Sequence, residues 1–285
     1  MTPQELVSEV ENLFSLPDVA LRLNELVSDP DTTNKQIVDV LQLDASLTAT
    51  VLRLANSAWF GLSSKVDTLS RAITLIGMGA LRDLVLAAAF IKRFQGIPGE
   101  FVNMKTFWDN SVACGVVSRN LSKRARLATS EQLFLAGLLH KIGRLVFFVA
   151  RPNAYREVLS QTENDSEASL LAAEKRVFGY THAQVGGALL KRWQLPALMQ
   201  NVVANQSNSE QLTDYPRERA ILQVASDMAH FLSPDIKLGP GEVLYTPDFP
   251  EVVWMDLGLT PADVTEVADI SLIQTYELIE IVNPR

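Results

Sequence analysis

The sequence is poor in the residues that build disulfides and metal centres. It has one cysteine, Cys114, and three histidines in 285 residues. One cysteine excludes an internal disulfide and suits a reducing compartment. The glycines form neither a GxGxxG fingerprint nor a Walker motif, so no phosphate-binding loop is predicted. Uncharged apolar runs of membrane-spanning length are also missing.

Basic charge is in deficit as well. Lys and Arg total 25 against 33 Asp and Glu, giving a formal net charge of −8 and a pI near 5.0. This balance argues against a broad nucleic-acid footprint, which needs a basic face. The N-terminus carries Glu5, Glu9 and Glu11 where a secretory signal is basic and then apolar. We therefore expect a soluble, cytoplasmic protein with no nucleic-acid or membrane partner.

What the chain does have is apolar residues at helical spacing. Hydrophobic residues make up 47% of the sequence, enough for a large core. Thr2-Pro3-Gln4-Glu5 has the form of a helix start, and helices are predicted over about 33–43, 45–57, 70–76 and 79–94. No strand pattern competes. The predicted fold is all-α, with an N-terminal helical lobe (1–95), a second helical lobe (100–231) and a C-terminal loop with helices (232–285). Gln95–Gly99, with two glycines and a proline, is the expected boundary.

The stretch Leu133–Val149 is the most apolar of the chain, yet it contains His140, Lys141 and Arg144. Basic residues at its centre disfavour a bilayer, where each costs about 2.5–3.5 kcal/mol. We predict one central buried helix. Small residues on both sides of the histidine, Gly137 and Gly143, predict that neighbouring helices approach closely. Buried polar groups need partners, so His140 and Lys141 should have them.

Other helices offer polar residues on their inward faces. Asn110 extends the apolar stripe of a helix that Thr106 is expected to cap, and Asn205 shares a face with Val202. His182 lies in the first turn of a helix capped by Thr181, where the helix dipole should keep its ring neutral. Asp227 lies on the stripe of Val224 and Met228 and is expected to be buried. Histidines and a carboxylate from several helices would suit a metal site in a helical bundle, but spacing alone favours hydrogen-bonded core residues.

Several segments resemble the HDOD domains, which are relatives of the HD-superfamily metal-dependent phosphohydrolases. The central helix FLAGLLHKIGRLV is similar to that family's usual GLLHDIG. VLRLANSAWFG, AITLIGMGALRDLVLA, FWDNSV and EKRVFGYTHAQVGGALLKRWQLP resemble other family segments in the right order. The resemblance covers about Leu13 to Ser209. It implies an N-terminal bundle packed on an HD-type helical domain.

The resemblance also implies which residues occupy the HD-site positions. His140, His182 and, by its placement, Asp227 are retained. Asn110 replaces the first histidine, Lys141 replaces the paired aspartate, and Asn205-Gln206 stands where a His-His pair is common. An ammonium is a donor only, and it repels a second cation. We consider two placements for Lys141: its ammonium replaces the metal and pairs with Asp227, or its side chain extends to the surface.

Two functions therefore compete. The favoured one is a non-catalytic regulatory or interaction module in bacterial signal transduction, with a degenerate metal site, no cofactor, a protein partner and room for a nucleotide ligand. The alternative is a metal-dependent phosphohydrolase acting on a nucleotide or another phosphoester. In that case one divalent metal (Fe, Mn, Zn or Mg) would be held by His140, His182 and Asp227. The signalling link comes from the resemblance alone.

Overall fold

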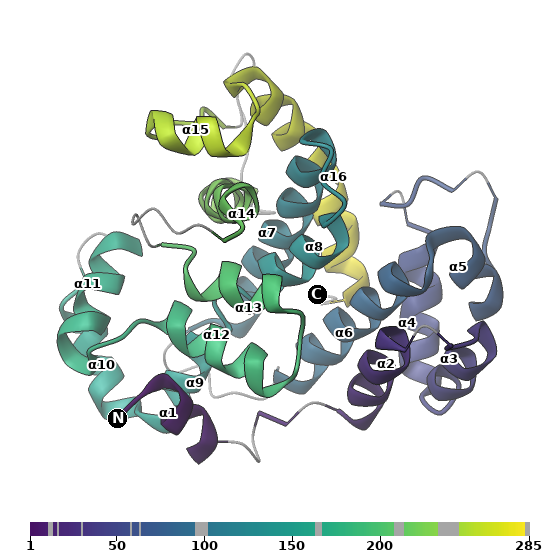
Figure 1. Ribbon diagram of the computed structural model, residues 1–285, viewed down its shortest axis with the longest axis horizontal. Helices are drawn as coiled ribbons and strands as arrows, with labels where there is room; N and C mark the ends of the chain where they lie inside the picture. The colour runs from purple at the N-terminus through teal and green to yellow at the C-terminus, as the bar shows by residue number, and fades with distance from the viewer. Residues whose placement is uncertain are drawn as a thin grey trace.

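The fold was derived from a computed structural model that describes residues 1–10, 14–15, 17–29, 31–57, 59–62, 64–94, 102–162, 167–207, 214–232 and 245–282. Over these ranges the secondary structure is helical, with no strand, as the sequence predicts (Figure 1). The helices form two lobes, and α6 (Met78–Phe94) contacts helices of both (Figure 1). This confirms the all-α fold class.

The smaller lobe is built from short capped helices, which lie on the right of Figure 1. They are α2 (Asp18–Ser28), α3 (Asn34–Leu41), α4 (Ala45–Ala55), α5 (Leu69–Ile76) and the start of α6 (Met78–Phe94). Thr33, Asp44 and Thr68 cap α3, α4 and α5 through their side chains. Gly77, at φ +85°, makes the turn between α5 and α6 where the sequence predicts a break. The lobe has its own apolar cluster, which includes Leu23 and Ile37.

The larger lobe surrounds the central stretch. Its helices are α7 (Met104–Arg124), α8 (Ser130–Leu139), α9 (Ile142–Ala150), α10 (Pro152–Ser160), α11 (Glu167–Phe178), α12 (His182–Arg192), α13 (Ala197–Ala204) and α14 (Pro216–Ala229). Asn103, not Thr106, caps α7, because its side-chain oxygen accepts from the amides of Lys105 and Thr106. The predicted helix therefore begins one turn earlier than expected.

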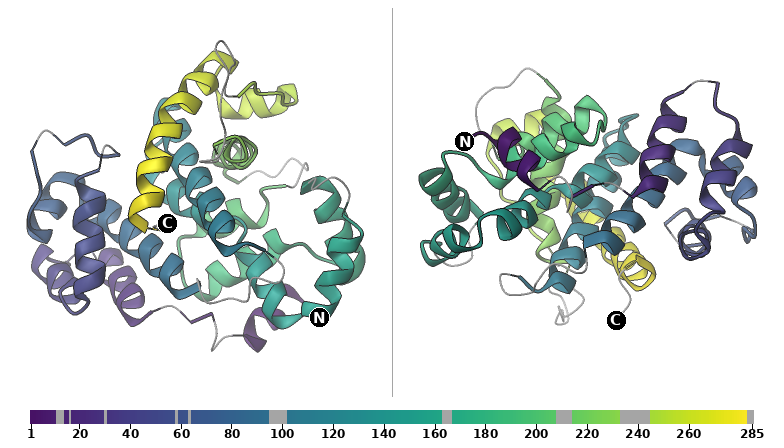
Figure 2. Two further views of the ribbon diagram at one scale, coloured as in Figure 1. Left: turned by 180° about the vertical axis from the view of Figure 1, so that it is seen from behind. Right: turned by 90° about the horizontal axis from the view of Figure 1, so that it is seen from below.

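The N-terminal helix α1 (Pro3–Glu9) packs on the larger lobe, against α12 and α9, although it precedes the smaller lobe in sequence (Figures 1 and 2). Arg151 Nη2 donates to Glu9 at 2.7 Å, and the Trp193 indole N–H donates to the Phe14 carbonyl at 2.7 Å. The expected boundary Gln95–Gly99 lies outside the described residues. The three-part division of the chain stays a prediction.

The C-terminal helices are α15 (Glu251–Leu257) and α16 (Pro261–Val282). α16 runs along α7 and reaches α4, so it contacts both lobes (Figure 2). Polar contacts attach it: Asn120 Nδ2 donates to Ser271 and Gln274, and Arg124 pairs with Asp263. The last helix therefore completes the core of the larger lobe.

The junction of the lobes contains a buried arginine. Arg119 pairs with Glu131 at 3.1 Å, and its guanidinium lies 4.3 Å from the centroid of the Trp59 ring. Asp83 of α6 is also buried and pairs with the adjacent Arg82 at 2.7 Å. Arg119 also donates to the Trp59 carbonyl at 3.5 Å, so this side chain links α7 to the segment that follows α4.

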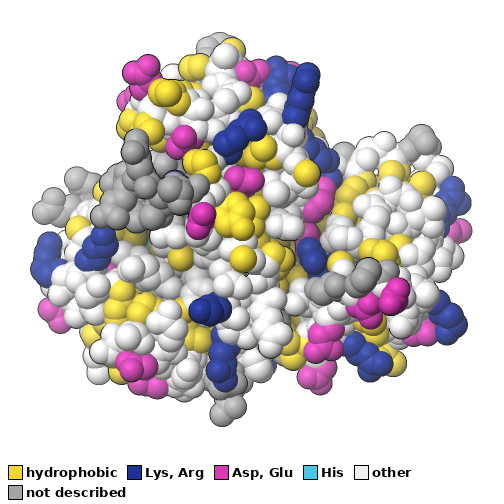
Figure 3. Space-filling view, viewed as in Figure 1, with side chains coloured by type: hydrophobic (Ala, Val, Ile, Leu, Met, Phe, Trp, Pro, Cys, Tyr) yellow, Lys and Arg dark blue, Asp and Glu magenta, His cyan; other side chains and the backbone are white. Residues whose placement is uncertain are grey.

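By length and composition alone, Ser130–Ala150 could cross a membrane, but 83% of this window is buried within the fold, as in a core helix. The pair α5 and α6 passes the same test together and is bent by 118°. On the face shown in Figure 3, acidic and basic side chains are interspersed over the described surface and do not form one basic patch.

Candidate functional site: a buried charge network

The central stretch is two helices, not the single helix predicted. α8 ends at Leu139 and α9 begins at Ile142, and the break falls on His140 and Lys141. Gln206, buried after α13, donates its Nε2–H to the His140 carbonyl at 2.7 Å and so satisfies an acceptor that the break exposes. At this break the side chains of His140 and Lys141, which are consecutive in sequence, are both buried.

The two glycines allow the close approaches that the sequence predicts. A Cβ on Gly137 would lie 2.7 Å from the Cys114 carbonyl oxygen of α7. A Cβ on Gly143 would lie 2.0 Å from the His182 carbonyl oxygen of α12. The break between α8 and α9 is therefore held between α7 and α12, and this contact brings His182 next to the central stretch.

His140 is fully buried and neutral. Burial, reinforced by the nearby Lys141 ammonium, holds the pKa of His140 well below its usual 6.5. Nδ1 donates to the Gly137 carbonyl at 2.6 Å, so Nε2 carries the lone pair, and it has no hydrogen-bond partner among the described residues. His140 thus supplies a buried, free acceptor.

His182 is held on both sides by carboxylates. Its Nδ1 lies 2.9 Å from Glu174 Oε2, its Nε2 lies 3.2 Å from Glu167 Oε1, and its backbone N–H donates to Glu174 at 2.8 Å. Tyr155 completes the Glu174 shell by donating its hydroxyl at 2.7 Å. Glu174 and His182 are 0% and 1% exposed, whereas Glu167 is 36% exposed.

This geometry makes His182 an imidazolium, so the prediction of a neutral ring is wrong. Burial alone would lower the pKa of His182, but the Glu174 and Glu167 carboxylates outweigh it and raise the pKa to about 9. His182 in turn lowers the pKa of both carboxyls against the effect of burial. The dipole at a helix N-terminus is equivalent to about half a charge, which two full charges at hydrogen-bond distance exceed.

Lys141 contributes a second cation to the same cluster. Its side chain is 6% exposed, so the prediction that it extends to the surface is wrong. Nζ lies 3.3 Å from Asn110 Oδ1, 3.4 Å from His230 Nε2 and 4.0 Å from Glu167 Oε2. Burial lowers the pKa of Lys141 and outweighs the attraction of Glu167. Asn110 and Lys141 are thus brought together, as the family positions imply.

Asp227 and Asn205 lie apart from this cluster. Asp227 is exposed, not buried, and its Oδ2 accepts from the Tyr245 hydroxyl at 2.7 Å. The ion-pair partner of Lys141 among the described residues is Glu167, so the predicted Lys141–Asp227 pair is wrong. Asn205 ends α13 and donates to the Asn201 carbonyl at 2.9 Å. Its neighbour Gln206 is the residue that contacts the central stretch.

The residues that sequence reasoning missed are the carboxylates of α11. Glu167 and Glu174 are seven residues apart, which places them two turns apart on one helix face. That spacing was a visible signal, since two acids on one face adjoin the histidine helix. We call Lys141, Glu167, Glu174 and His182 the charge network.

The donor set does not fit the divalent metal that an HD-type site would hold. A metal-bound imidazole needs one deprotonated nitrogen facing the ion, whereas both His182 nitrogens face carboxylates. Asp227 is bonded elsewhere, and a search of the described residues finds no group of three His, Cys, Asp or Glu arranged for a metal. A buried ammonium at Lys141 opposes a further cation.

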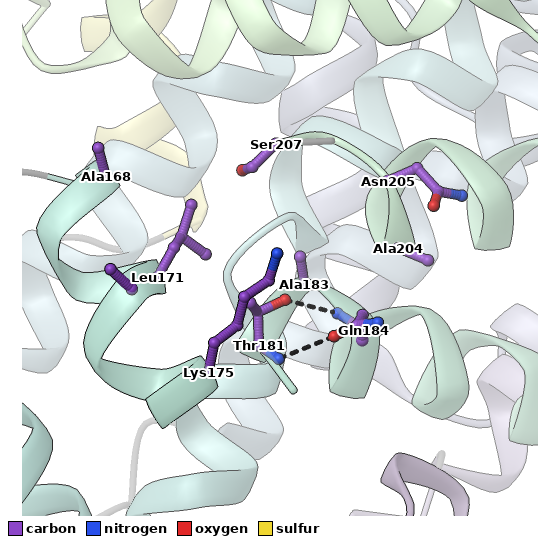
Figure 4. Close-up of a pocket in the computed structure, with 10 residues that line it drawn as sticks. Ala168, Leu171, Lys175, Thr181, Ala183, Gln184, Ala204, Asn205 and Ser207 are labelled. Atoms are coloured by element: carbon purple, nitrogen blue, oxygen red, sulfur yellow. Dashed lines mark hydrogen bonds between the residues drawn. The ribbon is translucent and has the colours of Figure 1, made fainter. Parts of the chain in front are cut away.

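A cavity of about 420 Å³ opens beside the network, between α11, α12 and α13 (Figure 4). Some of its lining residues are next to network residues in sequence: Ala168 follows Glu167, and Thr181 and Ala183 flank His182. Asn205 and Ser207, which flank Gln206, also line it.

The fold and the site together define a class: an all-α protein of HD-like architecture in which histidine, lysine and carboxylates are paired with one another. A sequence model of the HDOD domain matches residues 13–209. The chain belongs to the HDOD domain family.

Solved structures share this fold. A Geobacter sulfurreducens structure described as an HDOD domain protein with unknown function superposes with a TM-score of 0.74, 24% identity, and coverage of 98% of this chain and 97% of that one. A Shewanella amazonensis structure named "Putative phosphohydrolase" gives 0.77, 24%, and 97% of each chain. An uncharacterized Treponema pallidum protein is 27% identical over 204 residues, and the match covers 70% of this chain but 38% of that protein.

Proposed function

We propose that this chain is a non-catalytic HDOD-type module of bacterial signal transduction, which works in the cytoplasm by binding a protein partner. The observation that carries the proposal is the position of His182, whose two nitrogens both face carboxylates. In the proposal, the charge network takes over the structural role of a metal centre, and no metal or other cofactor is resident. The signalling role is inferred from the family.

Physical chemistry supports a structural over a catalytic role. A hydrolytic metal site keeps an open coordination position for water, and its ligands must offer lone pairs. Here the ammonium of Lys141 offers none, and the His182 lone pairs are taken by protons. The phosphohydrolase name belongs to a structure of 24% identity, a level that carries the fold and no activity.

Metal content and phosphoester turnover test this proposal. Protein made in medium supplemented with Fe, Mn and Zn, and purified without chelator, is expected to contain far less than one metal ion per chain by elemental analysis. It is expected to leave bis-p-nitrophenyl phosphate unhydrolysed with each metal added. The physical reason is that neither the Lys141 ammonium nor the ion-paired His182 offers a lone pair to a metal.

The matched variants are His140→Ala and Lys141→Asp. Restoring the carboxylate in Lys141→Asp is expected to leave the metal content low, because His182 stays engaged with Glu167 and Glu174. Stoichiometric metal in the unmodified protein that is lost in His140→Ala, together with metal-dependent turnover, would establish the phosphohydrolase instead.

A further inference from the structure

The cavity between α11, α12 and α13 has the dimensions of a ligand site. Its volume of about 420 Å³ lies within the range of about 300–1,000 Å³ for pockets that take small molecules. A neighbouring cavity of about 500 Å³ shares Gln184, Ala204 and Asn205 and is also lined by Lys191. All three helices present alanine methyl groups to the cavity, at Ala168 of α11, Ala183 of α12 and Ala204 of α13.

The chemistry of the walls is specific. Among the described residues that line this cavity, Lys175 is the one that carries a charge. In Figure 4 its side chain extends from α11 toward α12, into the space between Leu171 and Ala183. Ser207 adds a hydroxyl. Asn205 uses its amide nitrogen within α13, which leaves its oxygen to accept. A flexible ammonium and a hydroxyl suit a phosphate, while Leu171 and the alanines suit an apolar body.

The two acids of α11, Glu167 and Glu174, are both engaged with other residues. Glu167 precedes Ala168 at the cavity edge, but its carboxylate is paired with His182 at 3.2 Å and lies 4.0 Å from Lys141. The Glu174 carboxylate is buried and bonded to His182 and Tyr155. Among the described residues, no acid therefore forms an ion pair with Lys175, and its charge faces the cavity although the chain carries a net charge of −8.

We propose that this cavity binds a small organic phosphate monoester, with the phosphate at Lys175 and Ser207 and the body against Leu171. His182 of the charge network is bonded in the chain to the lining residues Thr181 and Ala183, so a change in the cavity wall can reach it through the backbone. Occupancy would be transmitted through α12 to the network without turnover. This ligand site rests on the proposed function: in a non-catalytic signalling module, the bound phosphate monoester would be the signal that the module senses.

Calorimetric titration of the intact chain tests the site with five probes: AMP, GMP, ribose 5-phosphate, inorganic phosphate and adenosine. At least one organic monoester is expected to bind with a Kd below about 1 mM. Adenosine is expected to bind at least about tenfold more weakly than AMP if AMP is the ligand, because it lacks the anion. The nucleotides and ribose 5-phosphate distinguish a nucleotide from a sugar phosphate.

Two lysine variants and one filled cavity make the test specific. Lys175→Met is expected to weaken binding about tenfold or more, and Lys191→Met, which removes the same charge from the neighbouring cavity, by less than about twofold. Ala172→Phe, at an exposed position of α11, is expected to abolish binding by filling the space while thermal unfolding shows that the fold is kept.

Absence of binding by all three organic phosphates would overturn this inference. So would equal weakening by Lys175→Met and Lys191→Met, or binding that persists in Ala172→Phe. None of these outcomes changes metal content or turnover, so failure of the ligand site is distinguishable from failure of the proposed function. The ¹⁵N signals of His182 provide an independent readout, since they should shift on saturation in the unmodified chain and stay unchanged in Ala172→Phe.

Discussion

Replacing His182 by Gln is expected to lower the free energy of unfolding by about 3–5 kcal/mol, the usual cost of removing one partner of a buried ion pair. Chemical denaturation followed by circular dichroism measures the change. Glu174→Gln is expected to show a loss of similar size, since it leaves the imidazolium buried with Glu167 alone.

The double variant distinguishes an ion pair from simple packing. Glu174→Gln combined with His182→Gln removes both charges, so its loss should be smaller than the sum of the single losses by about 2 kcal/mol or more. Losses that add to within about 0.5 kcal/mol would show that the two side chains are not coupled, which contradicts the network.

The same pair predicts how stability depends on pH. The pKa of His182 is about 9 in the folded chain and 6.5 when unperturbed. A raised pKa of this kind contributes stability that is fully present below pH 6.5 and is lost as the pH rises through 9, by an amount on the order of 3 kcal/mol. His182→Gln should lack this decline. Comparing the two proteins isolates His182 from other groups that titrate in the same range.

Gly143→Ala is expected to lower the free energy of unfolding by about 3 kcal/mol or more, since overpacking against rigid backbone forces the helices apart. The new methyl group would lie 2.0 Å from the His182 carbonyl oxygen and 2.7 Å from the Gly186 amide nitrogen. Both are backbone atoms of α12, so relief requires α9 to move from α12. That movement would also displace the N-terminus of α12, where His182 meets Glu174.

Gly79→Ala is the matched control. Gly79 lies in α6, and a Cβ there has no heavy atom within 4 Å. Alanine removes the entropic cost of glycine in a helix, so the substitution should be neutral or stabilising by up to about 1 kcal/mol. Equal effects of the two substitutions would contradict the close approach of α9 and α12.

Local signals in the sequence predicted most of the fold. Capping residues such as Thr2 and Thr181 mark helix starts, and apolar spacing gives the helices between them. The break at His140 and Lys141 was missed because uniform apolarity hides it: residues on every side of the stretch are buried, so the pattern fits one helix as well as two. The hydrogen bond to the His140 carbonyl at this break comes from the Gln206 side chain, which is distant in sequence.

The sequence predicted which helices contribute residues to the site better than it predicted which side chains contact one another. Asn110, His140, Lys141 and His182 lie around the central stretch. The charge of His182 depends on Glu167 and Glu174 of α11, whose spacing on one helix face was not recognised as part of a site. Asp227 was placed inside because it adjoins Met228. It lies at the exposed edge of that stripe, where Tyr245 from a later segment can reach it. The errors on His182 and on Asp227 both concern contacts with residues of other helices or segments, which the local pattern does not show.

The most direct test of the charge network is the ¹⁵N NMR spectrum of His182 at about pH 8 with excess Zn²⁺ present, assigned by comparison with His182→Gln. Our interpretation predicts that both ring nitrogens carry protons, as in an imidazolium, and that their signals are the same without zinc. A His182 nitrogen that loses its proton and becomes zinc-bound would show that this site is a metal centre and would contradict the account.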